Sequence, residues 1–146
     1  MRFLTKEIYS SIASGKIDGS HANLMSEEYQ KEFDKQNIDS EIPQQLIRLH
    51  DQEIEQLIMN EDRTMVLRFK DYGWGADQLE LRGAKVLTMD CWPENLNWLY
   101  HELFRAKRNK NEYELHILLS GRKNRAFEAN DLIVQCVEIA FEPNQK

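Results

Sequence analysis

Two neighbouring stretches decide the fold, residues 98–105 (WLYHELFR) and residues 112–119 (EYELHILL). The first stretch fits a helix, because its apolar residues recur at spacings of three and four. It also fits a strand, in which Tyr100 and Glu102 share one face. The second stretch alternates as a strand does, and sequential strands usually lie side by side. We therefore predict a hairpin across the polar loop between them, with a helix over 94–105 as the alternative.

The predicted hairpin fixes a register, because its paired residues lie symmetrically about residue 109. Glu102 then opposes His116, and Phe104 opposes Glu114, while Tyr100 shares their face of the sheet. The Cβ atoms of Glu102 and His116 are expected about 5 Å apart. A carboxylate beside an imidazole can orient and charge it for acid–base catalysis. As a simple cross-strand pair, the same two residues would stabilise the sheet by about 0.2–1 kcal/mol.

Further strands are predicted from period-two patterns on both sides of this hairpin. Gly83-Ala84 is expected to form a bulge within one of them. The predicted strands cover residues 53–59, 64–70, 79–89 and 127–141.

The N-terminal part has helical patterns instead. Thr5 is a suitable cap for a first short helix, and a second helix is predicted within residues 21–37. Pro43 suits the first turn of a third helix that ends near Leu49. The predicted fold class is therefore α+β, with N-terminal helices (1–49) packed on an antiparallel sheet of about six strands (50–142). Its 146 residues are expected to form a single domain.

Composition excludes several classes of protein. The formal net charge of -6 and the pI near 5.3 argue against a general nucleic-acid binder or a polybasic membrane protein. No apolar run is long enough to span a bilayer, and the N-terminus lacks the apolar core of a secretory signal. Cys91 and Cys136 match no CxxC pattern, so a cytoplasmic location is expected.

The acidic surplus belongs mainly to the helical part. Residues 1–60 carry 11 acidic and 6 basic side chains, whereas residues 61–146 carry 14 and 13. If an acidic surface serves function, the first residues to test are those of the second helix: Glu27, Glu28, Glu32 and Asp34.

One polar set could carry chemistry: His50, Asp51, Glu102 and His116. Their convergence would suit a small hydrolase or a metal-dependent enzyme. The simpler interpretation gives His50-Asp51 a role in a turn and makes Glu102–His116 a cross-strand pair. The four histidines show no spacing typical of metal ligands, and the chain has no GxSxG, Walker-type or GxGxxG motif. We therefore predict no cofactor and no metal, and we interpret both cysteines as small buried apolar side chains.

Basic and aromatic residues near loops have two interpretations each. Arg105, Lys107, Arg108 and Lys110 fall in one predicted loop, and Arg122, Lys123 and Arg125 fall in the next. Consecutive hairpin loops lie at opposite ends of a meander, so these charges are interpreted as solvated and not as a nucleic-acid site. Trp74, Trp92 and Trp98 either line an interaction surface or pack at the edge of the core.

Several short motifs resemble a group of small bacterial proteins, chiefly from Gram-positive species. They are MRFLTKEIYSSI at 1–12, LIRLHDQEIEQL at 46–57, WLYHEL at 98–103 and EYELHILLS at 112–120. The chain thereby resembles the domain-of-unknown-function family 4085 over most of its length, and that family implies no activity. Its strand motifs are also similar to small proteins that accompany bacterial toxins as immunity factors.

Three functional hypotheses follow. The favoured one is a non-catalytic cytoplasmic bacterial protein that binds a partner protein or a second copy of itself. A specific form of it is an immunity-type inhibitor, whose acidity would complement a basic nuclease toxin. The third is the small enzyme described above.

Overall fold

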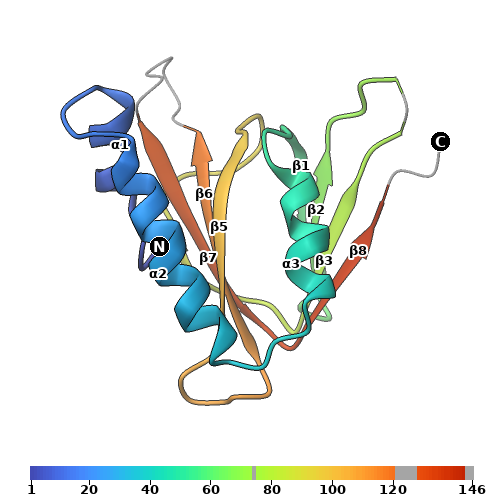
Figure 1. Ribbon diagram of the computed structural model, residues 1–146. Helices are drawn as coiled ribbons and strands as arrows, with labels where there is room; N and C mark the ends of the chain where they lie inside the picture. Colours follow the sequence, from blue (N-terminus) through green and yellow to red (C-terminus); the bar gives the residue numbers. More distant parts are fainter. Residues whose placement is uncertain (74, 121–127, 144–146) are drawn as a thin grey trace.

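The computed structural model describes residues 1–73, 75–120 and 128–143. The helices come first: α1 (Lys6–Ala13), α2 (Ser20–Asp34), α3 (Glu41–Leu46) and a 3-10 turn, η1 (Ile47–Leu49). The strands follow: β1 (Ile54–Met59), β2 (Met65–Phe69), β3 (Gln78–Arg82), β4 (Lys85–Met89), β5 (Trp98–Arg105), β6 (Tyr113–Ser120), β7 (Ala129–Cys136) and β8 (Glu138–Glu142). The protein is thus α+β with N-terminal helices, as the sequence predicts (Figure 1).

The prediction of one sheet is wrong. In the described ranges the strands form two antiparallel sheets of four, in the orders β1-β2-β3-β8 and β4-β7-β6-β5. The reason is that two predicted strands, 79–89 and 127–141, bend and run through both sheets. The first bends at Gly83, which has a φ of 64°, and the second bends at Val137. The bent strands stay paired at this corner, where the Val137 N–H donates to the Arg82 carbonyl at 2.8 Å.

The sheets also meet where the chain enters β1 and β5. The Trp98 N–H donates to the Gln52 carbonyl at 2.9 Å, and the Ile54 N–H donates to the Leu96 carbonyl at 2.9 Å. Backbone hydrogen bonds therefore join the two sheets at a second place, far along the chain from the first corner.

The main apolar core lies between the sheets. Leu67, Leu81, Leu115 and Val134 are among its fully buried side chains. Leu46 at the end of α3 is fully buried in the same core, and so is Leu49 of η1. This short helical segment therefore fills a gap between the sheets, and Figure 1 shows α3 between β5 and β8.

A bulge explains the irregular apolar pattern of the first strand. The β1–β2 register shifts between Ile54 and Gln56. Ile54 and Leu57 are three positions apart, so regular alternation would place them on opposite faces of the strand. Because of the bulge, both side chains are buried. The strand predicted for this segment is confirmed, and its imperfect period has a local cause.

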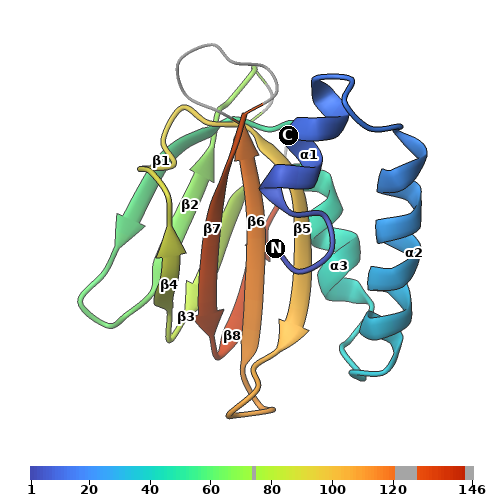
Figure 2. The same cartoon turned by 90° about the vertical axis from the view of Figure 1, so that its left-hand side faces the viewer.

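α1 and the segment before it lie on the outer face of sheet β4-β7-β6-β5, and α2 lies beside β5 (Figure 2). Thr5 caps α1 as predicted, because its Oγ1 accepts the Ile8 N–H at 3.2 Å. α2 covers the open edge of β5: the Leu103 N–H donates to the Tyr29 hydroxyl at 2.8 Å, and the Arg105 N–H donates to Gln36. These two backbone N–H groups of β5 are therefore not free to pair with another strand at this edge of the sheet.

Candidate functional site

The predicted register of the central hairpin is confirmed. Glu102 pairs with His116 and Phe104 pairs with Glu114 across β5 and β6, so residues 98–105 form a strand and not a helix. Both faces of β5 are buried, one against the core and the other under the N-terminal segment, and Glu102 and Phe104 on the outer face are fully inaccessible. Burial on both faces is why apolar spacing alone does not distinguish strand from helix here.

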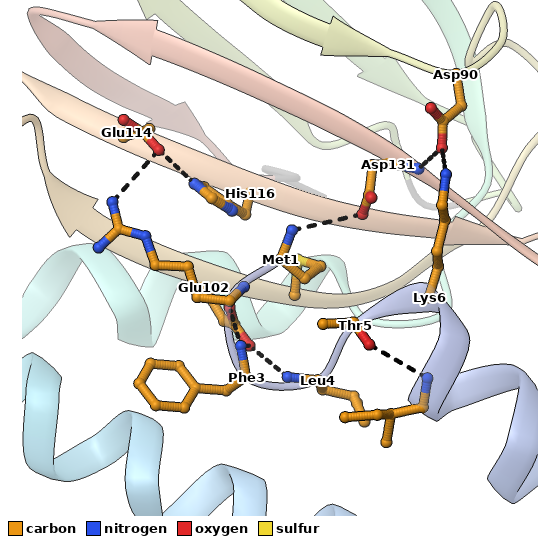
Figure 3. Close-up of polar contacts among 12 residues, drawn as sticks. Met1, Phe3, Leu4, Thr5, Lys6, Asp90, Glu102, Glu114, His116 and Asp131 are labelled. Atoms are coloured by element: carbon orange, nitrogen blue, oxygen red, sulfur yellow. Dashed lines mark hydrogen bonds and ion pairs between the residues drawn. The ribbon is translucent and has the colours of Figure 1, made fainter.

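Glu102 binds the backbone of the N-terminal segment and not His116 (Figure 3). Its carboxylate accepts the N–H groups of Arg2 at 2.7 Å, Phe3 at 3.2 Å and Leu4 at 2.9 Å. In the described part of the chain, no hydrogen bond joins Glu102 to His116. A buried carboxylate requires such donors, and three backbone donors use most of its capacity. Glu102 is therefore an anchor for residues 2–4.

His116 has Glu114 as its partner. Its Nε2 lies 2.6 Å from Glu114 Oε1, and burial lowers the pKa of His116 despite this hydrogen bond. The Arg2 guanidinium covers the pair from outside, 3.5 Å from Glu114 Oε1 and 3.9 Å above the Phe104 ring. His116 is only 5% exposed, so other residues of the chain shield this carboxylate–imidazole pair from solvent.

Two further ion pairs fasten the same segment (Figure 3). The Met1 amino group lies 3.6 Å from Asp131 Oδ1, and Lys6 Nζ lies 2.8 Å from Asp90 Oδ2. Asp90 also accepts the Asp131 N–H at 2.8 Å, so the two carboxylates belong to one connected group. Burial opposes ionisation of Asp90, but the hydrogen bonds from the Asp131 N–H and from Lys6 together hold its pKa below the usual value. These contacts hold the start of α1 on β7.

His50 and Asp51 lie elsewhere, at the exposed end of η1. His50 Nδ1 is 3.1 Å from Asp51 Oδ2, and both side chains are more than half exposed. Asp51 has a φ of 66° and donates its N–H to the Trp98 carbonyl at 2.7 Å, which gives it the role in a turn that the simpler interpretation assigns. No hydrogen bond or ion pair within the described ranges joins His50 or Asp51 to Glu102 or His116. The four predicted residues therefore do not converge.

A groove lies between α2 and α3, with β5 beneath it. Its volume is about 540 Å³, which is within the usual range of ligand sites. Seven of its twelve lining side chains are apolar or aromatic, and the other five are polar: Ser26, Gln30, Asp34, Ser40 and Gln44. The apolar and aromatic lining includes Tyr29, Phe33, Ile47, His50, Tyr100 and His101. Sequence reasoning missed this groove because its lining comes from three separate segments, each with an ordinary pattern.

Three titratable side chains of the groove, Tyr29, Tyr100 and His101, are neutral near pH 7. Burial, with a smaller effect from His50, lowers the pKa of His101 to about 4. Its Nδ1 accepts the Trp98 Nε1–H at 3.3 Å, which also requires an unprotonated Nδ1. Burial raises the pKa of Tyr29 to about 12, and it raises the pKa of Tyr100 further. The floor of the groove, formed by Tyr29, Tyr100 and His101, is therefore uncharged. It suits an apolar ligand group that also has an atom able to form a hydrogen bond.

The helical part of the chain, which supplies most of the groove lining, carries an acidic excess. Residues 20–51 carry 7 acidic and 3 basic side chains. Asp34 lines the groove itself. Ile47 is 67% exposed at its margin, the largest exposed fraction of any large apolar side chain in the described ranges. The groove thus belongs to a part of the chain with an acidic excess, and one of these carboxylates, that of Asp34, lines it.

The tryptophans, Cys136 and the basic residues at 122–125 were also candidates from the sequence. Trp98 is fully buried in the core, Trp92 is 48% exposed, and Trp74 lies outside the described residues. Burial raises the pKa of the Cys136 thiol to about 12, so it is a poor nucleophile. The basic residues predicted at 122–125 also lie outside the described residues.

No group of three or more His, Cys, Asp or Glu side chains in the described ranges is arranged to hold a metal ion. No helix there has the length and apolar character needed to cross a membrane.

Comparisons with family models, curated proteins and solved structures gave no match. The resemblance to family 4085 therefore stays a prediction.

Proposed function

We propose that this protein is a non-catalytic binding domain that receives a segment of a partner protein in the groove between α2 and α3. The occupant we infer is a short amphipathic segment with an apolar anchor and flanking Lys or Arg residues. The observation that carries this proposal is the exposed Ile47 beside a groove of about 540 Å³ with an uncharged, largely apolar floor. A buried apolar anchor in such a groove is a common mode of helix recognition.

Charge supports a basic partner. The helices on either side of the groove belong to residues 20–51, which carry an excess of 4 acidic side chains out of the net charge of -6. Complementary charge speeds encounter and disfavours acidic competitors. A second copy of this chain would bring the same acidic helices to the groove, so a basic partner is favoured over a homodimer.

An immunity-type inhibitor is a specific form of this function. The same acidic excess favours it, because a nuclease toxin that binds nucleic acid has a basic surface. Its test is protection: co-expression of the wild-type chain should rescue cells from the cognate toxin, and a groove variant should lose that rescue.

The general proposal is tested with a synthetic amphipathic peptide of Leu and Lys and with its Leu/Glu counterpart. Amide shifts in a two-dimensional NMR spectrum should move at the groove residues Tyr29, Ile47 and His101 with the basic peptide only. Ile47→Ser should weaken binding at least about 10-fold, as expected for loss of an anchor. The matched control is Leu24→Ser on α2, which is 48% exposed and outside the groove lining. Shifts away from the groove, or equal effects of the two substitutions, would contradict the proposal. A concentration-dependent dimer that Ile47→Ser abolishes would replace the basic partner with a second copy.

A further inference from the structure

A second concave site lies just beyond the C-terminal end of α2, and it shares no lining residue with the groove. Its volume is about 460 Å³. One wall is the chain that leaves α2, and the other is the end of β5 with the following turn. The lining residues are Lys35, Gln36, Asn37, Arg105, Ala106, Lys107, Lys110 and Asn111. Every one of these side chains except Ala106 carries a cationic or amide group, and none is a carboxylate.

Unpaired positive charge gathers at this pocket. Within residues 1–73, 75–120 and 128–143, nine Lys and Arg side chains form no ion pair. Five of the nine line the pocket or lie beside it in the turn: Lys35, Arg105, Lys107, Arg108 and Lys110. Elsewhere, cations such as Lys6, Arg82 and Lys70 face carboxylates at 2.8–3.3 Å. In the part of the chain that the structure describes, a protein with a net charge of -6 thus has one local cluster of positive charges that no carboxylate neutralises.

The base of the pocket is held in place by hydrogen bonds. The Arg105 N–H donates to the Gln36 side chain, and its guanidinium donates to the Asn37 carbonyl at 3.2 Å. The Arg105 guanidinium also lies 4.9 Å from the centre of the Tyr113 ring. In the turn, the Ala106 N–H donates to the Glu112 carbonyl at 3.0 Å. A preformed site loses less conformational entropy when a ligand binds.

We propose that this pocket binds a compact anion that carries two or more phosphate groups, such as a nucleoside polyphosphate. Several cations that converge in one concavity repel one another and gain most from a ligand with several negative charges. Lys and Arg together with amide N–H donors are the groups that bind phosphate oxygens. The volume suits a small molecule.

A long polyanion fits less well. The chain as a whole is acidic, and the acidic helix α2 adjoins the pocket, so a nucleic-acid strand that extends beyond the pocket would meet negative charge. Lys35 has a second role, because a cation at the C-cap of α2 offsets the helix dipole. That role leaves the cluster in the turn unexplained.

The experiment titrates the full chain with inorganic triphosphate, with ATP and with adenosine at constant ionic strength, and follows binding by calorimetry and NMR. We expect triphosphate and ATP to move the amide signals of 35–37 and 105–111, and adenosine to leave them in place. The double variant Lys107→Gln/Lys110→Gln should weaken triphosphate binding at least about 10-fold, because two charge-assisted contacts are lost. The control is Lys16→Gln/Lys85→Gln, which removes the same charge at two exposed lysines that also form no ion pair.

Three results would overturn the proposal. One is the absence of triphosphate shifts at the pocket, and another is an equal loss of affinity in the two double variants, which would indicate general charge attraction. The third is tighter binding of a single-stranded oligonucleotide than of triphosphate, with shifts that spread beyond the pocket. Equal affinity for ATP and triphosphate would assign recognition to the phosphates alone, whereas tighter ATP binding would add a contact with the nucleoside. None of these outcomes depends on the groove between α2 and α3.

Discussion

The anchor of the N-terminal segment is directly testable with Glu102→Gln. The substitution keeps the shape of the side chain but removes its charge and replaces one acceptor oxygen with an amide donor. In the wild-type chain this carboxylate accepts three backbone N–H groups at 2.7–3.2 Å in a fully buried position. The variant therefore leaves at least one N–H facing another donor.

The expected loss of stability follows from these contacts. A hydrogen bond to a charged group contributes about 1.5–3 kcal/mol, and an unsatisfied buried donor costs a similar amount. Because residues 2–4 can detach and hydrate, the three bonds do not add fully, and we expect the free energy of unfolding to fall by about 2–4 kcal/mol. For a chain of this size the melting temperature should fall by about 6–16 °C.

The assay combines urea denaturation with amide hydrogen exchange. Exchange at Arg2, Phe3 and Leu4 should accelerate in Glu102→Gln more than exchange in the core between the sheets. The control is Glu138→Gln, whose carboxylate is 57% exposed and pairs with Arg82 at the surface. That change should cost less than about 1 kcal/mol. Equal stability of the two variants, with unchanged exchange at residues 2–4, would refute the role of Glu102 as the anchor.

Two further predictions concern stability. Because the pKa of His101 is lowered to about 4, the unfolded chain binds more protons than the folded chain between about pH 6.5 and pH 4. The contribution of His101 to the free energy of unfolding is complete above that window, and it is lost by up to about 1.4 kcal/mol per pH unit as the pH falls through the window. In urea titrations at several pH values, the free energy of unfolding of His101→Gln should therefore fall less steeply with decreasing pH than that of the wild-type chain. An equal pH dependence of the two proteins would contradict this prediction. Gly83→Ala should destabilise by about 1–3 kcal/mol, because φ is positive and the new Cβ would lie 2.7 Å from Val137 Cγ2. The double variant with Val137→Ala should recover part of the loss in thermal melts, since the clash is removed and the backbone strain is not.

Local patterns predicted the elements that depend on local interactions. The Thr5 cap, the strand positions and the register of Glu102 with His116 are confirmed because capping, alternation and a short hairpin loop are encoded by nearby residues. The two-sheet arrangement was not predicted, because the alternation of residues 79–89 and 127–141 is the same whether a strand stays in one sheet or bends into another. Gly83 marked the position of the bend, and a bulge within one sheet explained the same residue equally well.

The candidate sites depend on long-range contacts, which is why sequence reasoning placed them incompletely. The partners of Glu102 are backbone N–H groups, and these have no residue type by which to recognise them. Arg105, Lys107 and Lys110 were visible as a charged loop, but Lys35 and the concave shape come from packing of α2 beside that loop. Conversely, His50 and Asp51 were grouped with Glu102 and His116 by chemistry alone, and the fold separates them.

The fastening of the N-terminal segment has a consequence for synthesis in the cell. Glu102, the anchor of residues 2–4, is translated 98 to 100 positions after them, and Asp90 is translated 84 positions after Lys6. α1 also contacts β7, one of the last strands to be translated. The docking site of α1 is thus incomplete until β7 has been translated, and until then a nascent chain carries α1 exposed to chaperones.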